Sequence, residues 1–126
     1  MKTIWIVDDD EDMIRAVQLM VRLLDCETRL FYSARLAAQT LLNGEHPDLF
    51  ILDINMPEVS GIDFLEFLRH RKNTMNIPVV MLSTEAADVM VDKAMALGAD
   101  SYVTKPVAIE ELENAMKVAF QAHGLK

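Results

Sequence analysis

The sequence predicts an α/β fold in which helices cover both faces of a parallel β-sheet. Two observations support this fold class. Short apolar runs alternate five times with longer segments whose apolar residues recur at helical spacing, within 126 residues. The first, third and fourth runs are rich enough in Ile, Val and Leu to be buried on both faces, as parallel strands are. Strand-then-helix units of this kind are joined by right-handed crossovers, which place helices on both sides of one sheet.

The elements follow from these patterns in chain order. Strands are expected near residues 3–7, 27–32, 48–52, 77–82 and 101–104. The first helix, 11–24, has Ile14, Val17 and Val21 at helical spacing. The second lies between Ser33, a suitable N-cap, and Gly44, a suitable C-terminal stop. The remaining helices are expected at about 62–71, 85–97 and 109–121.

Acidic residues stand at the carboxyl ends of two of these strands. The first strand is followed by Asp8, Asp9 and Asp10, and the third by Asp53. The flavodoxin-like strand order 2-1-3-4-5 places strands 1 and 3 side by side at the point where ligands bind in open α/β sheets. Carboxylates brought this close repel one another unless a cation holds them, and hard oxygen ligands suit Mg²⁺. The sequence therefore predicts a divalent-cation site at this edge.

Two further strands end in groups that complement a phosphate. Ser83 and Thr84 follow the fourth strand with hydroxyls, and Lys105 follows the fifth with an ammonium. A carboxylate flanked by a divalent ion, a lysine and a hydroxyl can attack phosphorus, because each equatorial phosphoryl oxygen meets a positive charge or a donor. The expected product is an aspartyl phosphate at Asp53. Asp10 is expected only to cap the first helix.

Composition limits the class of protein. A length of 126 residues predicts a single domain over 1–126, and a net charge of −8 argues against direct nucleic-acid binding. The apolar runs are far shorter than the ~20 residues of a membrane span, and the start lacks a signal-peptide pattern. Cys26 is the single cysteine and cannot form an internal disulfide. A soluble protein in a reducing cytoplasm is expected.

The residues at the strand ends resemble the response-regulator receiver domain of two-component signalling, and the single-domain chemotaxis regulators in particular. The resemblance covers essentially all 126 residues, including Met56-Pro57 and Gly61 after the third strand. It implies a phosphoacceptor module, which is not an enzyme in the ordinary sense although it phosphorylates and dephosphorylates itself with Mg²⁺, or with Mn²⁺ as a substitute. The implied residue roles are phosphoacceptor Asp53, metal ligands Asp8, Asp9, Asp53 and the Asn55 carbonyl, switch residues Ser83 and Tyr102, and phosphate-contacting Lys105, before a cis bond to Pro106.

Three positions are implied to tune the phosphoryl lifetime. In the family that lifetime depends on the positions of Asn55 and Glu85, and this polar pair resembles the fast chemotaxis type. Thr84 stands where alanine is usual, beside the path of the phosphate, and Ser83 stands where threonine is more frequent. We expect hydrolysis within minutes.

The resemblance also implies partners. A sensor histidine kinase or a phosphotransfer protein would supply the phosphoryl group, and the surface of the fourth helix with the fifth strand and helix would bind a downstream protein. Ala115 occupies a position where dimerising receivers carry arginine, so a monomer is expected.

A helical wheel divides the fourth helix into an inner and an outer face. Ala87, Val91, Ala94 and Met95 share the face that is expected to meet the sheet. Val89, Met90 and Ala96 fall outside it, and an apolar area of this kind is typical of an interaction site.

Two other classes use related features. Asp8-x-Asp10 after the first strand resembles the nucleophile motif of haloacid dehalogenase phosphatases, with Asp8 as the nucleophile. The chain is short for that class, and Asp53 would have no role. A dinucleotide or flavin binder needs a glycine-rich first turn, whereas five acidic residues, 8–12, occupy this turn and would repel a pyrophosphate.

Overall fold

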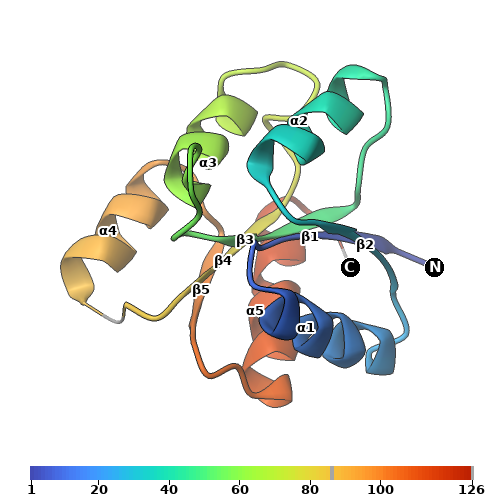
Figure 1. Cartoon of the computed structure of the whole chain (residues 1–126), viewed down its shortest axis with the longest axis vertical. Coiled ribbons are helices and arrows are strands. Elements are labelled where there is room, and N and C mark those ends of the chain that lie inside the picture. The colour runs from blue at the N-terminus through green and yellow to red at the C-terminus, as the bar shows by residue number, and fades with distance from the viewer. Residues whose placement is uncertain (86, 126) are drawn as a thin grey trace.

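The computed structural model describes residues 1–85 and 87–125, which form a three-layer α/β fold (Figure 1). The five strands are parallel, in the order β2-β1-β3-β4-β5, as the sequence predicts. In chain order the elements are β1 (Thr3–Val7), α1 (Glu11–Leu23), β2 (Glu27–Phe31), α2 (Ala34–Leu42), β3 (Leu49–Asp53), α3 (Gly61–Arg69), β4 (Val79–Ser83), α4 (Asp88–Ala96), β5 (Ser101–Thr104) and α5 (Ile109–Ala122).

The central strands divide their side chains between two hydrophobic cores. On β1, Trp5 and Val7 pack on the side of α2, α3 and α4, while Ile4 and Ile6 pack on the side of α1 and α5. β3 and β4 alternate in the same way, because successive strand residues point to opposite faces. In Figure 1, α2 and α3 accordingly lie above the sheet, with α1 and α5 below it. Every residue of β3 and β4 is buried, so these strands cannot shift in register without exposing apolar side chains.

The fourth helix begins later than the sequence pattern indicates. α4 starts at Asp88, three residues after the expected start at Glu85, and Ala86 lies outside the described residues. The backbone N–H of Glu85 donates to Ser83 Oγ at 3.0 Å, and its carbonyl accepts from the Tyr102 hydroxyl at 2.8 Å. The backbone N–H and the carbonyl of Glu85 are therefore both engaged in hydrogen bonds that do not belong to a helix.

The inner face of α4 also differs from the helical wheel. Ala94 is fully buried and Met90 is half-buried against the core, whereas Ala87 and Met95 are exposed. The expectations that Ala87 and Met95 meet the sheet and that Met90 lies on the outer face are therefore wrong, because Met90 and Ala94 are the residues that pack against the core. Val89, at 81% exposed, and Ala96 do face outward.

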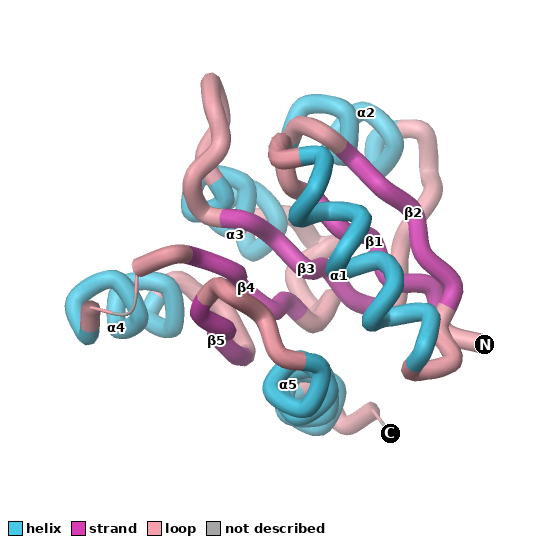
Figure 2. Tube along the Cα trace, turned by 60° about the horizontal axis from the view of Figure 1, so that its bottom comes forward, coloured by secondary structure: helices cyan, strands magenta, loops and turns pink. Residues whose placement is uncertain are grey.

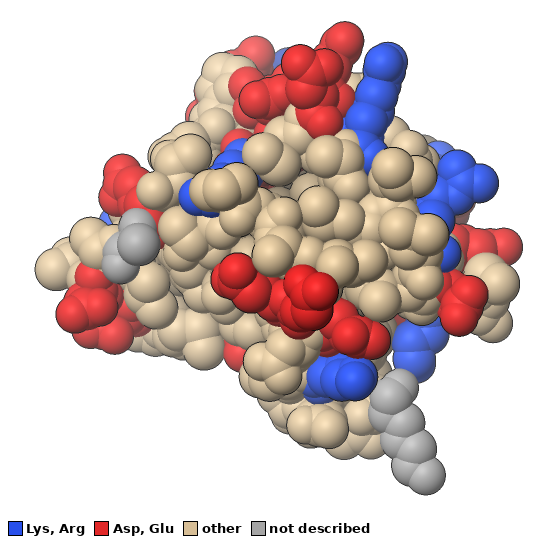
Figure 3. Space-filling model, turned by 90° about the horizontal axis from the view of Figure 1, so that it is seen from below, with Lys and Arg blue, Asp and Glu red and all other residues tan. Residues whose placement is uncertain are grey.

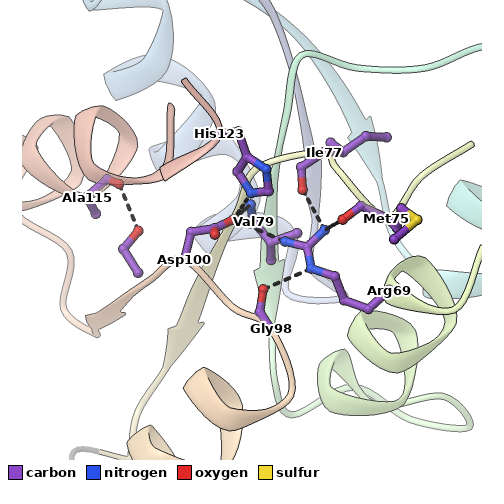
Figure 4. Close-up of polar contacts among 9 residues, drawn as sticks. Arg69, Met75, Ile77, Val79, Gly98, Asp100, Ala115 and His123 are labelled. Atoms are coloured by element: carbon purple, nitrogen blue, oxygen red, sulfur yellow. Dashed lines mark hydrogen bonds and ion pairs between the residues drawn. The ribbon is translucent and has the colours of Figure 1, made fainter. Parts of the chain in front are cut away.

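A polar network ties five segments together at the amino ends of β4 and β5 (Figure 4). The Arg69 guanidinium donates to the carbonyls of Met75, Ile77 and Gly98 and to Asp100 Oδ2. The same Asp100 oxygen accepts from the Val79 N–H at 2.8 Å and lies 3.0 Å from His123 Nε2. The ends of α3 and α5 are thus joined to the start of the sheet, opposite the edge that carries the acidic residues.

The face formed by α1 and α5 is mostly uncharged, with acidic side chains across its middle and at its margins and a few basic side chains among them (Figure 3). On α1, Leu19 and Leu23 are 64% and 68% exposed. An exposed apolar area of this kind is available for contact with another protein. Over residues 1–85 and 87–125, none of the helices has the length and hydropathy that crossing a membrane requires.

Removing one partner of the Arg69 and Asp100 ion pair should lower stability strongly, because the two charged groups lie 3.1 Å apart and both side chains are largely buried. Removing one partner leaves the other charge buried and unpaired. We expect Asp100→Ala to lower the free energy of unfolding by about 3 kcal/mol in urea denaturation. The control is Glu113→Ala, which removes an exposed partner of Lys117 and should cost less than about 0.5 kcal/mol. Equal losses of unfolding free energy in the two variants would contradict this role of the buried ion pair.

Candidate functional site

The candidate site lies at the carboxyl ends of the strands, where β1 and β3 are neighbours. The loops after β3 and β4 leave the sheet at this same edge (Figure 2). Asp8 follows β1 directly and Asp53 is the last residue of β3, and they are 0% and 3% exposed. Parallel pairing with Val7 opposite Leu52 brings the two acids to adjacent strand ends. The sheet itself therefore places two buried carboxylates side by side.

Lys105 bridges the two carboxylates. Its ammonium lies 3.0 Å from Asp53 Oδ1 and 3.3 Å from Asp8 Oδ2, and its side chain is 12% exposed. The Lys105 N–H donates to the Ser83 carbonyl at 2.8 Å, and the Lys105–Pro106 bond is cis, as the resemblance implies. The second oxygen of Asp8 accepts from the backbone N–H of Asp10 at 3.0 Å. Both oxygens of Asp8 consequently have a donor.

The surroundings of Asp53 raise the pKa of its carboxyl above the ordinary value. Burial, followed by the charges of Asp8 and Asp9, raises the pKa of Asp53 to about 6, although the hydrogen bond and charge of Lys105 oppose the shift. At Lys105, burial disfavours the charged form, but hydrogen bonds and charges from Asp53 and Asp8 together outweigh it and raise the pKa. The site thus carries more negative charge than one lysine can balance.

The acidic cluster has the donors that a divalent cation needs. Asp8, Asp9 and Asp53 each offer one carboxylate oxygen, and these three oxygens lie within 4.8 Å of one another. Asp9 is exposed while the other two are buried, so the cluster opens to solvent on one side. Mg²⁺ prefers oxygen ligands and usually keeps several waters. The donor set therefore fits Mg²⁺, with room for water or a phosphate oxygen on the open side.

The predicted switch residues lie beside this cluster. Ser83 is the last residue of β4 and is fully buried, with its Oγ accepting from the Glu85 N–H. Tyr102 on β5 is half-buried, and its hydroxyl donates to the Glu85 carbonyl. The two bonds connect Ser83 to Tyr102 through one backbone unit. Sequence reasoning missed this link, because a hydrogen bond to a backbone N–H or carbonyl does not depend on the type of residue that supplies the group.

Gly61 makes a close contact that sequence reasoning also missed. A Cβ at Gly61 would stand 2.1 Å from the Asp53 carbonyl oxygen, and the Gly61 N–H donates to the Ile54 carbonyl at 2.9 Å. Only glycine lets the start of α3 approach the backbone of Asp53 this closely. Asn55 and Thr84, the other predicted site residues on these loops, are both exposed.

The chain belongs to the response regulator receiver domain family, which it matches over residues 4–117. It is 34% identical over 122 residues to the transcriptional regulatory protein BasR of Escherichia coli K12, covering 95% of this chain and 53% of BasR. It is 32% identical to the two-component response regulator ARR10 of Arabidopsis thaliana, covering 95% of this chain and 21% of ARR10. The chain thus spans about half or less of these relatives.

Solved structures agree with this family. The receiver domain of the Francisella response regulator 1452 superposes with a TM-score of 0.83 at 25% identity, covering 97% of this chain and 99% of that one. The chemotaxis response regulator CheY4 of Vibrio cholerae superposes with a TM-score of 0.83 at 25% identity, covering 94% and 98%. The predicted family and fold are confirmed, and the relatives are response regulators, not haloacid dehalogenase phosphatases. Domains of this family work in signal transduction with sensor histidine kinases and are not enzymes in the ordinary sense.

Neutralising Asp53 should stabilise the protein in buffer without divalent cations. Because its folded-state pKa of about 6 lies above the ordinary value of 3.8, this carboxyl favours folding only below the ordinary pKa, and that contribution is lost as pH rises through about 6. We expect Asp53→Asn to raise the free energy of unfolding at pH 7.5 by about 2 kcal/mol, less than the full shift because Lys105 loses a charged partner.

The measurement is urea unfolding at pH 7.5 and at pH 4.5, with exposed Asp12→Asn as the control for removing one charge. The gain from Asp53→Asn should shrink at the lower pH, where the wild-type carboxyl takes up a proton. A mutant less stable than wild type at pH 7.5 would show that pairing with Lys105 outweighs desolvation.

Proposed function

We propose that residues 1–126 are a single receiver domain that accepts a phosphoryl group on Asp53 from the phosphohistidine of a kinase or phosphotransfer protein in the cytoplasm. The observation that supports this most directly is the position of Asp53, 3.0 Å from the Lys105 ammonium and in reach of the Asp8 and Asp9 oxygens. A buried carboxylate with an ammonium on one side and a candidate divalent-cation site on the other suits attack on a phosphoryl group.

The proposed reaction forms a bond between an Asp53 oxygen and phosphorus and breaks the bond between phosphorus and the imidazole nitrogen, which keeps the electron pair. Lys105 contacts one phosphoryl oxygen, and the Ser83 hydroxyl donates to another. Asp8, Asp9 and Asp53, with the Asn55 carbonyl, would hold Mg²⁺ or Mn²⁺, whose charge offsets the phosphoryl oxygens. In autodephosphorylation a water attacks the phosphorus and the bond from phosphorus to the Asp53 oxygen breaks, which releases inorganic phosphate and returns the free carboxylate. The exposed Asn55, Thr84 and Glu85 tune the rate of this step toward minutes.

Phosphorylation should be detectable without a kinase. In acetyl phosphate with Mg²⁺ or Mn²⁺, we expect intact-mass spectrometry to show one added phosphoryl group, and none in EDTA, because the carboxylates cannot face a phosphate without a cation. Asp53→Asn should abolish the added mass. The same gain in mass in Asp53→Asn would show that another residue is the nucleophile, and Asp8 would be the next residue to test.

The switch should depend on Lys105. A phosphoryl group drawn to Lys105 and Ser83 would withdraw the Ser83 hydroxyl from the Glu85 N–H, and Tyr102 is bonded to the same residue. We expect Lys105→Ala to bind Mg²⁺ yet lose the beryllofluoride-dependent changes in amide spectra at residues 83–85 and 101–107. Changes of wild-type size in the mutant would rule out this role for the lysine.

The downstream partner is proposed to bind α4 with β5 and α5, as a heterologous contact of a monomer. Val89 and Ala96 give this surface exposed apolar area, Met90 supports it from the core, and Tyr102 lies at its edge. We expect light scattering to show a monomer with and without beryllofluoride. A dimer that forms only with beryllofluoride would contradict the expectation of a monomer. If Val89→Lys dissociates that dimer and Leu19→Lys on α1 does not, the α4, β5 and α5 surface would still be the binding surface.

A further inference from the structure

Asp10 has two separate roles at the start of α1. As the N-cap, its Oδ1 accepts from the N–H groups of Asp12 at 3.0 Å and Met13 at 3.2 Å. Its carbonyl accepts from the N–H of Ile14 at 2.9 Å, and Ile14 is fully buried in the core under α1. Three hydrogen bonds, two to its side chain and one to its backbone carbonyl, therefore hold Asp10 against the first turn of the helix.

The same residue orients a carboxylate of the acidic cluster. The Asp10 N–H donates to Asp8 Oδ1 at 3.0 Å, while Asp8 Oδ2 faces the Lys105 ammonium at 3.3 Å. Because the Asp8 side chain is only 1% exposed, water has little access to replace a lost donor. The Asp10 N–H is thus one of the two donors, with the Lys105 ammonium, that fix how the Asp8 carboxylate is turned.

Losing the cap would release that N–H. Without the Asp10 side-chain acceptor, two N–H groups of the first turn have no protein partner, and the end of the helix frays. Fraying loosens the backbone of Asp10, which as the N-cap lies in the extended region at φ −85° and ψ 111°. The Asp8 carboxylate then loses its fixed orientation.

We propose that Asp10 is a positioning residue for the divalent-cation site, and that it acts through the helix cap and not through its charge. The inference rests on the proposed role of Asp8 as a metal ligand. It requires that an uncharged residue able to cap α1 preserve the site, and that an equally uncharged residue unable to cap it weaken the site. An electrostatic role would weaken both variants alike.

Asparagine and glutamine separate the two roles, because both carry a neutral amide but only asparagine is a good N-cap. Magnesium affinity would be measured by calorimetry at constant ionic strength for wild type, Asp10→Asn, Asp10→Gln and Asp10→Ala. The matched control is Asp12→Asn, which removes a charge from the same turn and leaves the cap in place. Amide hydrogen exchange of residues 10–14 in the metal-free protein reports the cap independently.

We expect Asp10→Gln and Asp10→Ala to weaken Mg²⁺ binding about fivefold, and Asp10→Asn and Asp12→Asn to stay within about twofold of wild type. Exchange at residues 10–14 should quicken only in the two weakened variants. Equal affinities of the Asn and Gln variants, whether both weak or both like wild type, would overturn the inference. Where Gln prevents folding, the comparison of Asp10→Ala with Asp10→Asn decides, since alanine has no side-chain acceptor and is a poor N-cap.

Asp8→Asn separates this inference from the proposed function. If wild type binds Mg²⁺ and Asp8→Asn weakens the binding, the proposed metal site is supported. The comparison of Asp10→Asn with Asp10→Gln then decides the role of Asp10. If Asp8→Asn binds as wild type does, Asp8 is not a ligand, and both the proposed metal site and the inference fail.

Discussion

The contact on which the rest of the site depends is the bridge from Lys105 to Asp8 and Asp53. The parallel sheet brings two buried carboxylates to neighbouring strand ends, and no relaxation of surface side chains can separate them. One ammonium at 3.0 and 3.3 Å balances part of this charge, and Asp9 adds a third acid on the open side. The remaining negative charge makes a divalent cation a favourable addition, and a dianionic phosphoryl group alone an unfavourable one.

The fold was predictable because both faces of the sheet are covered. Burial on both faces makes β1, β3 and β4 continuous apolar runs, and acids directly after such runs can only lie at the carboxyl edge. The pattern of strand ends therefore predicted four residues of the site, Asp8, Asp53, Ser83 and Lys105. Their gathering at one edge followed from the strand order, which places β1, β3, β4 and β5 in one row.

The parts that sequence reasoning missed depend on backbone groups or on distant pairs. The start of α4 at Asp88 follows from bonds to the backbone of Glu85, which residue type does not encode. Gly61 is recognisable as a turn residue, but its contact with the Asp53 carbonyl requires the packing of α3. Arg69 meets Asp100 across 31 positions of sequence, and neither belongs to a local pattern that predicts the pair.

Burial divides the site into a fixed part and an adjustable part. Asp8, Asp53 and Ser83 are buried at strand ends, so their positions follow the sheet and any substitution there changes the core as well. Asp9, Asn55, Thr84 and Glu85 are exposed on loops around them, where substitutions usually cost little stability. Changes in the second group can alter access of water and phosphate while the reacting groups stay in place. Thr84 lies in this second group, so under the proposed function its bulk would act on the lifetime of the phosphoryl group without disturbing the Asp53 carboxylate.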